Sequence, residues 1–415
     1  MRRMITSIVM LAVVTIGAVV VVADEAWPPF EVSKAVPMTH GPKKHFFGYF
    51  GVSPWNASQK YMLCIETDFD DRMPEPEDAA TIGIIDTKTR EFKPLVKTYA
   101  WNVQQGAFQR WLPTDPDHKF IYNDRVGDRF VSVIYDIETG EKRVLPRAIS
   151  ALSHDGRTAL CINYARAKRL RPVIGYAGGS DPTEGVEQPE DDGIFTMDIQ
   201  TGETKLILSV ADVARNYDGP EDFGGKEMWV SHTGLNPSDT RFHFLLRYNR
   251  VGMSFRTAMY TAGVDGSDPR RVIEFGNGVS HFGWKDDATV LATMDLEDEG
   301  KGSAHVIFPD RENPEYTRLG REALKQDGHA SFSPDGRWMV TDTYPDGKYR
   351  QTLYLLDLKT GKHLVLGRFK SNIRYQGAIR CDNHPRWSPD GTMISFDSLH
   401  GKSRQMYVIK LKSFE

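Results

Sequence analysis

Short runs of alternating apolar and polar residues, separated by polar turns, recur along most of the chain. The two clearest copies are SPDGRWMVTD, which begins at Ser333, and SPDGTMISFD, which begins at Ser388. Each reads as a tight turn followed by a strand with one buried face, because successive side chains of a strand point to opposite sides. Weaker copies of this turn and strand begin at Ser53, Asp115, Ser153, Asn236 and Lys285. The pattern therefore occurs seven times.

A second strand and turn follow most of these copies, in segments such as YDIETGEKRVL and LDLKTGKHLVL. A unit of four short antiparallel strands cannot bury both of its faces alone, so such units pack around a common axis. The repeat thus predicts an all-β fold, a seven-bladed β-propeller that forms one domain over residues 24–415. The chain ends after the third strand of the last unit. We therefore expect the segment around Phe30–Val36 to supply the missing outer strand and to close the ring.

Residues 1–23 differ from the rest of the chain. Arg2 and Arg3 precede an uncharged run from Met4 to Ala23, which ends in small residues before Asp24. A basic start, an apolar middle and a small-residue end are typical of a cleaved signal peptide, which predicts a periplasmic or secreted protein. The alternative is an uncleaved membrane anchor, because the run is long enough to span a bilayer.

The composition is that of an ordinary globular protein, with 40% hydrophobic and 26% charged residues. The net charge of −4 and the lack of a basic stripe argue against a nucleic-acid partner. We expect no stable membrane insertion of the mature domain, and the sequence is silent on oligomeric state. Three cysteines are too few for a disulfide framework. Cys64 and Cys161 lie in apolar strands and are expected to be buried, whereas Cys381 lies in the polar segment RCDNHP.

Histidines occupy one equivalent position in four successive units. With the seven units aligned on the first residue of each turn, the position four residues upstream is histidine in the last four: His232, His281, His329 and His384. In the first three units it is Tyr49, Trp111 and Ile149. Histidine makes up 12 of 415 residues, so the coincidence has a chance on the order of one in a thousand in such a repeat. We expect these four rings to converge at one mouth of the central channel.

Neutral imidazole is a common ligand of first-row metals and a proton carrier near neutral pH. Both uses require rings that are held rigidly around a point that solvent can reach, and inner strands provide this. The alternative is that each ring only hydrogen-bonds to a neighbouring blade.

The chain resembles known propeller families at these motifs. Its SPDG and D-x-x-T-G signatures resemble the TolB-type repeat over nearly the whole mature chain. The C-terminal half resembles oligogalacturonate lyases and, more loosely, seven-bladed ulvan lyases. The matching stretches are VSHFGW with His281, HASFSPDG with His329, IRCDNHPRWSPDG with His384, and FRTAMYTAGVDG with Arg256.

The resemblance implies a divalent metal held by His329 and His384. In the last of these stretches the family has a glutamine and an earlier histidine, where this chain has Ile379 and Asp382. Cys381 or Asp382 is therefore expected to replace the lost ligands. Zinc is slightly favoured over manganese and calcium, because a thiolate ligand suits zinc.

The activity implied is that of a polysaccharide lyase that cleaves an acidic, uronate-containing oligosaccharide by β-elimination. A base removes the proton α to the carboxylate, and an arginine or metal neutralises that carboxylate. By the resemblance, His281 is the base and Arg256 holds the carboxylate. His232 and Tyr49, from the same column, are candidates to return a proton to the leaving oxygen.

Two long connections, Thr67–Ala80 and Tyr164–Gly193, are expected on the face of the histidines, and loops of this length are usually functional. The second supplies the candidate substrate contacts Arg166, Arg169, Arg171 and Tyr176. Gln104 and Gln105 lead into the second inner strand and are candidates to line the channel mouth. The alternative is that the arginines pair with the acidic stretch that follows them, and that the amides hydrogen-bond to strand ends.

Two other functions compete with a lyase. A non-catalytic TolB-like binding or scaffold propeller explains the fold and the export, but leaves the histidine column unexplained. A glycoside hydrolase requires two inner carboxylates at a productive separation, and the aligned column has none. No G-x-S-x-G motif supports a serine hydrolase.

Overall fold

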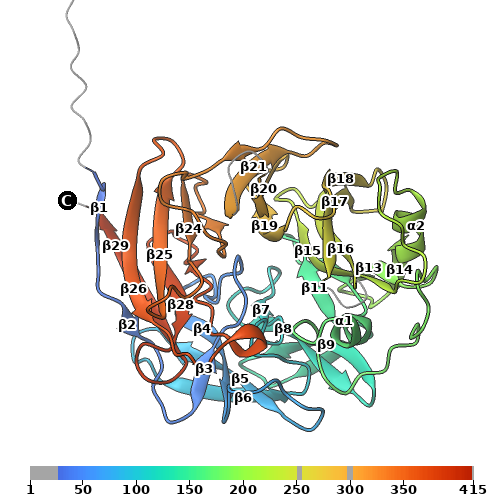
Figure 1. The fold of residues 1–415 in the computed structure, drawn as a ribbon. Coiled ribbons are helices and arrows are strands. Elements are labelled where there is room, and N and C mark those ends of the chain that lie inside the picture. Colours follow the sequence, from blue (N-terminus) through green and yellow to red (C-terminus); the bar gives the residue numbers. More distant parts are fainter. Residues whose placement is uncertain (1–26, 250–254, 297–301, 414–415) are drawn as a thin grey trace, which may run out of the picture.

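The computed structural model describes residues 27–249, 255–296 and 302–413, so the predicted signal at residues 1–23 lies outside the described residues. Seven antiparallel sheets are arranged radially around a central channel (Figure 1). The predicted seven-bladed β-propeller is therefore confirmed. Among the described residues, no helix is long and apolar enough to cross a membrane.

The blades follow one another along the chain. The first contains β3 (Lys44–Phe46), β4 (Tyr61–Thr67), β5 (Ala80–Asp86) and β6 (Phe92–Thr98). The second contains β7 (Arg110–Trp111), β8 (Lys119–Val126), β9 (Arg129–Asp136) and β10 (Lys142–Leu145). The third contains β11 (Ile149–Leu152), β12 (Thr158–Cys161), β13 (Gly193–Asp198) and β14 (Thr204–Ser209). The fourth contains β15 (Met228–Leu235), β16 (Arg241–Tyr248), β17 (Arg256–Gly263) and β18 (Arg270–Ile273).

The remaining blades have the same order from the channel outwards. The fifth contains β19 (Ser280–Trp284), β20 (Thr289–Asp295), β21 (Ser303–Pro309) and β22 (Thr317–Arg318). The sixth contains β23 (Ser331–Phe332), β24 (Trp338–Thr341), β25 (Arg350–Asp357) and β26 (His363–Lys370). The seventh contains β27 (Arg386–Trp387), β28 (Met393–Ser398) and β29 (Gln405–Ser413), to which β1 (Phe30–Val32) and β2 (Val36–Pro37) are added.

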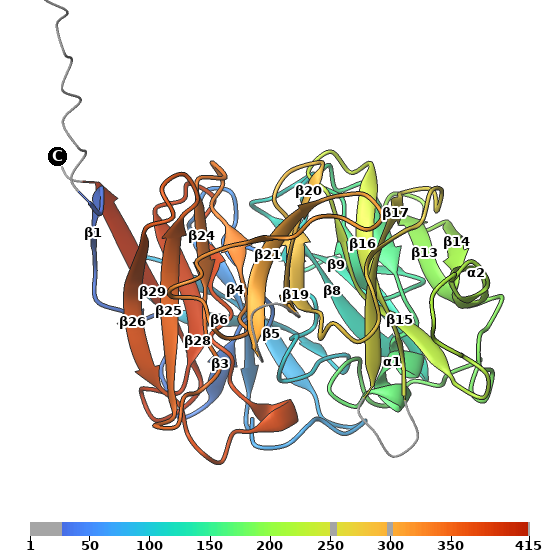
Figure 2. The ribbon, with the colours of Figure 1, turned by 45° about the horizontal axis from the view of Figure 1, so that its top comes forward.

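The ring is closed by the N-terminal segment, as predicted. β29 pairs antiparallel with β1, where Val32 lies opposite Leu411, and with β2, where Val36 lies opposite Val408. Figure 2 shows β1 beside β29 at the outer edge of the seventh blade. The first and last strands of the described chain therefore share one sheet.

Apolar side chains fill the space between neighbouring blades. One cluster joins the sixth and seventh blades through residues such as Val340, Leu353 and Phe396. Cys64 and Cys161 are fully buried in their strands, which confirms the prediction for both. Burial of this kind contributes about 25 cal/mol for each Å² of apolar surface removed from water, and it keeps the inner strands in place around the channel.

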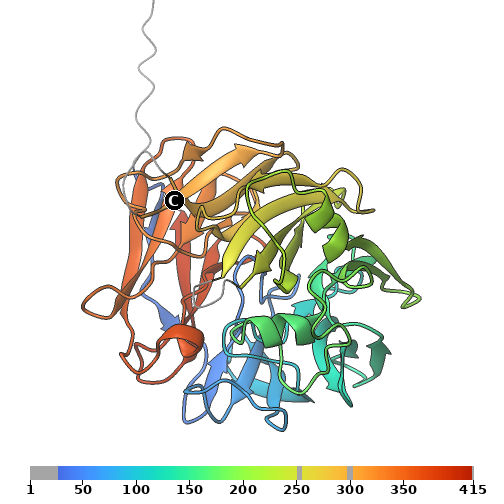
Figure 3. The same ribbon diagram turned by 45° about the vertical axis from the view of Figure 1, so that its right-hand side comes forward.

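Two short helices were not predicted. α1 (Tyr164–Leu170) lies in the long connection of the third blade, and α2 (Val210–Arg215) follows that blade. The side chains of Asn163 and Ser209 cap their N-termini by accepting backbone N–H groups. Helices of two turns or less contain too few residues to show helical periodicity. Figure 3 shows α1, in green, on the same side of the ring as the 3₁₀ turn Gly377–Ile379, in red.

A buried ion pair of the seventh blade holds the backbone that follows the first strand of the first blade. The Arg386 guanidinium is fully buried and donates to the Asp397 carboxylate at 2.7 Å and to the Tyr49 carbonyl oxygen at 2.5 Å. Asp397 also accepts the backbone N–H groups of Phe47 and Gly48. The pair therefore fixes the segment that carries Tyr49 through the channel.

We expect Arg386→Met to lower the free energy of unfolding by about 3–5 kcal/mol, because it leaves a buried carboxylate without its cation. The matched control is Arg350→Met, which removes the partner of the partly exposed Asp346 and should cost less than about 1 kcal/mol. Urea unfolding of both variants measures the difference. Equal, small losses would show that the buried pair does not stabilise ring closure.

Candidate active site

A cavity of about 450 Å³ lies at the channel mouth where the inner strands begin. All four histidines of the column line it: His232, His281, His329 and His384. The structure also places Tyr49, Gln104, Gln105 and Asp382 there. The rings of His281 and His329 are 3.9 Å apart between centroids, and those of His329 and His384 are 4.2 Å apart. Four successive blades thus bring imidazoles to one cavity.

The backbone of three of these histidines is strained. φ is +57° at His232, +34° at His281 and +45° at His384, in the left-handed region that non-glycine residues seldom occupy. The strand ladders of β15 and β19 shift register at the first two of these positions. Such bulges re-aim a side chain, and strain of this kind is concentrated at functional sites. The local backbone therefore turns the rings into the channel.

His281 forms a pair with a carboxylate. Its Nδ1 lies 2.8 Å from Oδ1 of Asp327, which Thr293 also contacts. Burial alone would raise the pKa of Asp327, but the charge and hydrogen bond of His281 hold it below its ordinary value. An ionised carboxylate accepts the Nδ1 proton, which leaves the Nε2 lone pair free. The arrangement suits a general base.

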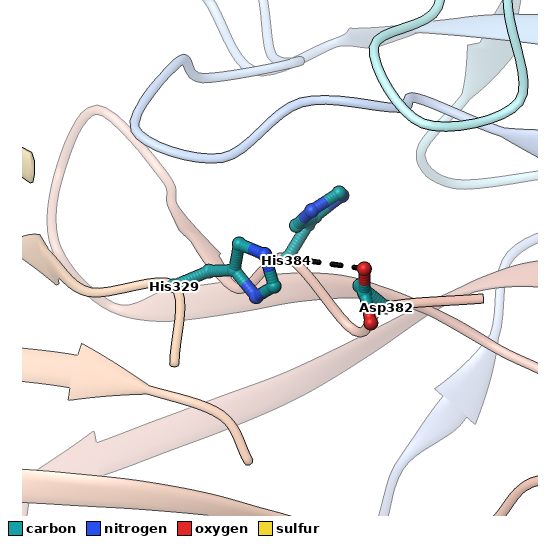
Figure 4. A group of neighbouring side chains, drawn as sticks. All are labelled: His329, Asp382 and His384. Carbon is teal, nitrogen blue, oxygen red and sulfur yellow. Dashed lines mark ion pairs between the residues drawn. The ribbon is translucent and has the colours of Figure 1, made fainter. Parts of the chain in front are cut away.

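His329, Asp382 and His384 form a group with the composition of a metal site. Their ligand atoms all lie within 4.8 Å of one another. Figure 4 shows the three side chains together, and His329 Nε2 is 4.0 Å from Asp382 Oδ2. Behind them, Asp342 accepts His329 Nδ1 at 2.8 Å and the backbone N–H of His384 at 3.0 Å. A carboxylate that orients the far nitrogen of a histidine is usual around bound metals.

The donor set fits a divalent ion. Two imidazoles and one carboxylate leave coordination positions open, as catalytic sites do. Burial and the neighbouring His329 hold the pKa of His384 well below its ordinary value, so its ring is in the neutral form that binds metals. Arg380 also donates to the Asp382 carboxylate, at 2.5 and 2.9 Å, but a carboxylate has lone pairs enough for both partners.

Cys381 does not belong to this group. Its side chain is buried outside the cavity lining, and burial raises the pKa of its thiol to about 12. Neighbouring side chains of an extended segment point to opposite sides, and Asp382 takes the side of the channel. Among the described residues the metal-type group does not include Cys381, so the structure does not support the thiolate ligand that favoured zinc.

Arg256 does not line the cavity, contrary to the prediction. Its guanidinium pairs with Glu221 at 2.9 Å, at the start of β17. Glu221 lies in an irregular segment well before Arg256 in the sequence, and it draws the cation away from the channel. The structure therefore does not support Arg256 as the carboxylate clamp.

Three other arginines line the cavity: Arg380, which is paired with Asp382, and Arg171 and Arg247. Arg247 is buried and donates to hydroxyl groups, including Thr257 Oγ1 at 3.1 Å, while Arg171 lies over the Phe255 ring at 3.6 Å. Neither has a carboxylate within 4.0 Å in the part of the chain that the structure describes. Burial lowers the pKa of Arg247 to about 9 and that of Arg171 to about 10, so both are cationic at neutral pH. The cavity can therefore hold an anion.

The other predicted loop contacts are structural. Arg166 is buried and donates to backbone carbonyls, including that of Met228 at 2.7 Å. Arg169 pairs with Asp181 at 2.8 Å and with Glu227 at 2.7 Å, which both lie outside the acidic stretch 183–193. Tyr176 is buried among aromatic rings. None of the three lines the cavity. They hold the connection that presents Arg171.

The amide and hydroxyl groups of the mouth do line the cavity. Gln105 Nε2 lies 3.2 Å from His232 Nε2, and Gln104 Nε2 donates to the Arg380 carbonyl at 2.6 Å. Burial, reinforced by the charge of Arg247, holds the pKa of His232 well below its ordinary value. This ring is therefore neutral. Burial also raises the pKa of Tyr49, which keeps its hydroxyl protonated.

Arg247 and Arg380 were not predicted, and three further residues of the site were missed as well: Tyr344, Asp327 and Asp342. The Tyr344 ring lies 6.1 Å from His281 and 5.9 Å from His329 between centroids, and burial raises its pKa. One of the three had a signal in the sequence. Asp342 ends the SPDGRWMVTD repeat just as Asp397 ends SPDGTMISFD, and both carboxylates bind backbone N–H groups at the channel mouth.

No family model and no curated protein matches this chain. Solved structures do. An oligogalacturonate lyase from Vibrio parahaemolyticus has a TM-score of 0.62 at 15% identity, and an oligogalacturonate lyase in complex with manganese has 0.64 at 17%. Both matches cover 92% of this chain and 96% of the other. TolB from Acinetobacter baumannii has 0.42 at 13%, over 86% of this chain and 80% of that one. At 15% and 17% identity, the likeness to the two lyases establishes the fold alone.

Proposed function

We propose that this protein is a metal-dependent lyase that cleaves uronate-containing oligosaccharides by β-elimination. One observation carries the proposal. A single cavity combines a histidine–carboxylate pair, a group of metal-type ligands and two guanidinium groups that have no carboxylate partner among the described residues. The apolar, basic run in residues 1–23 suits an enzyme exported to meet such a polymer.

Arg171 and Arg247 take the role that the sequence suggested for Arg256. In a desolvated cavity their charge interacts strongly with an anion. A uronate carboxylate between them loses much of its negative charge, so its α-proton becomes acidic enough to remove. This electrostatic effect is worth several kcal/mol in comparable sites.

His281 accepts that proton at Nε2, while Asp327 holds the ring through Nδ1. The electron pair of the C–H bond forms the new double bond, and the bond from the next carbon to the glycosidic oxygen breaks. The leaving oxygen takes a proton from a neutral donor, for which Tyr344, His232 and Tyr49 are placed around the cavity. Tyr344 is favoured because its ring lies close to the base.

A divalent ion held by His329, Asp382 and His384 would supply Lewis-acid stabilisation of the charge that develops on the substrate carboxylate. Imidazole and carboxylate donors suit manganese or zinc, whereas calcium prefers an all-oxygen set. The manganese complex of a structural neighbour supports the choice of manganese for the first assays.

The competing functions explain less. A TolB-like binding propeller needs neither the His281–Asp327 pair nor strained histidines. A glycoside hydrolase needs two carboxylates that flank the scissile bond. Among the described residues that line the cavity, Asp382 is the one carboxylate, and Arg380 already binds it.

The test is an elimination assay. We expect the mature protein with manganese to act on at least one of pectic, glucuronate-containing and ulvan-type oligosaccharides, and to form an unsaturated product with strong ultraviolet absorbance. The control is the same oligosaccharide with its carboxylates reduced to alcohols. Absence of product from all three substrates, in the presence of manganese or zinc, would favour a binding module.

We expect Arg247→Gln to reduce kcat/KM for the preferred uronate by about 10²–10³-fold, as the loss of one preorganised charge-stabilising donor does elsewhere. Arg129→Gln, on the exposed start of β9, is the matched control and should match the wild-type protein. Steady-state kinetics of both variants measure the effect. Equal rates for Arg247→Gln and Arg129→Gln would remove Arg247 from the site.

A further inference from the structure

The channel holds a second cavity, of about 290 Å³, beyond the histidine mouth. Tyr49 and Phe50 line both cavities and form the wall between them. The second cavity is lined by inner-strand residues that follow the histidines in sequence, such as Thr233 after His232 and Gly283 after His281. It therefore lies deeper in the channel, away from the proposed active site.

One side chain in this cavity is a cation without a counter-charge. Arg110, at the start of β7, lines it. No carboxylate lies within 4.0 Å of its guanidinium in the described ranges, and its buried Nε has no hydrogen-bond partner. Its guanidinium lies over the Phe108 ring, 5.6 Å from the ring centroid. Burial lowers the pKa of Arg110 to about 10, so it stays charged at neutral pH.

Arg110 differs from Arg386 in having no carboxylate partner among the described residues. Both guanidiniums lie beside the channel, but Arg386 is paired with Asp397. Arg110 is only partly exposed, and a partly buried charge without a counter-charge is unfavourable relative to water, so proteins rarely keep one without a function. The guanidinium of Arg110 is therefore available to pair with a bound anion.

A second polar group in the same cavity lacks a partner. His243 is only 5% exposed, and its Nδ1 has no hydrogen-bond partner. Burial lowers its pKa to about 3, so the ring is neutral. The absence of a side chain at Gly234 makes room for it, because a Cβ there would come within 2.4 Å of the ring. The ring is therefore an uncharged part of the cavity wall and does not neutralise Arg110.

The rest of the wall is largely apolar. It includes Phe108, Leu152, Leu235, Leu291 and Phe332. Three hydroxyls of the wall are engaged within the protein, since Ser150 Oγ and Thr233 Oγ1 lie 2.6 Å apart and Ser331 donates to the Pro385 carbonyl at 3.3 Å. One unpaired cation and apolar walls select a ligand with one negative charge and an apolar body.

We propose that this second cavity binds a small organic monocarboxylate, with Arg110 paired to the carboxylate and the apolar walls enclosing the remainder. The site is separate from the proposed lyase centre and does not depend on it. The cavity is too small for an oligosaccharide, and its single cation does not favour a dianion.

Titration calorimetry of the full mature chain with benzoate, acetate and inorganic phosphate tests the proposal. We expect saturable binding of benzoate, weaker binding of acetate, and at least a tenfold loss of benzoate affinity in Arg110→Gln, which corresponds to about 1.4 kcal/mol. Arg129→Gln should bind as the wild-type protein does. His281→Asn should also bind normally, because it lies in the other cavity.

Urea unfolding of Arg110→Gln shows whether a loss of binding comes from misfolding of the variant. Without ligand, Arg110→Gln should unfold at an equal or higher urea concentration than the wild-type protein, because it removes an uncompensated charge. The proposal would be overturned if neither benzoate nor acetate showed saturable binding, or if Arg110→Gln bound benzoate as the wild-type protein does. Tighter binding of phosphate than of benzoate would also overturn it, and so would loss of benzoate binding in His281→Asn. A lower urea midpoint for Arg110→Gln would do so as well, because it would reveal a partner for Arg110 within the protein.

Discussion

His281→Asn is expected to lower kcat for uronate elimination by about 10²–10⁴-fold, the range that a positioned general base contributes. Asparagine can keep a hydrogen bond to Asp327, but it has no nitrogen lone pair that can accept the substrate proton. The metal content should not change, because the His329, Asp382 and His384 group is left intact. Steady-state kinetics together with metal analysis measure both quantities.

The control for this variant is His118→Asn, which changes a half-exposed histidine remote from the cavity. It should retain full activity. Activity of His281→Asn within a few-fold of the wild-type value would place the base elsewhere. His232→Asn would then be the next variant to measure, because His232 is the other neutral ring that the cavity offers.

His329→Ala and His384→Ala are expected to abolish metal binding, from about one ion per chain to none, because each removes one of three ligands. Cys381→Ser should keep the full metal content, because the thiol lies outside the group. Asp342→Asn should give an intermediate result, with metal affinity reduced about 10–100-fold, since it disturbs the carboxylate that orients His329.

Metal analysis after dialysis against manganese or zinc distinguishes these outcomes. Thermal unfolding of each variant checks that the fold is kept. Loss of metal in Cys381→Ser, with retention in His329→Ala, would reverse the ligand assignment and restore the thiolate site expected from the sequence.

The blades could be predicted because their signals are local. An SPDG turn and an alternating strand lie within about ten residues, and such a unit specifies the same hairpin wherever it recurs. The histidine column was visible for the same reason. Its members keep a constant distance from a turn, and the bulges that aim His232 and His281 inwards lie at that same distance.

The charged groups of the site depend on contacts that are distant in sequence. Arg256 follows the pattern of a clamp but is paired with Glu221, whereas Arg247 and Arg171 reach the cavity from different blades. Similarly, Cys381 and Asp382 are neighbours in an irregular segment, and only the path of the backbone decides which one faces His329. A local sequence pattern does not show which of these side chains faces the cavity.

The mass of the products formed in heavy-oxygen water tests the central claim most directly. Elimination adds no water, so we predict an unsaturated product that is one water lighter than a hydrolysis product and carries no heavy oxygen. Incorporation of heavy oxygen into a saturated product would show hydrolysis, and would contradict a lyase built on His281, Arg171 and Arg247.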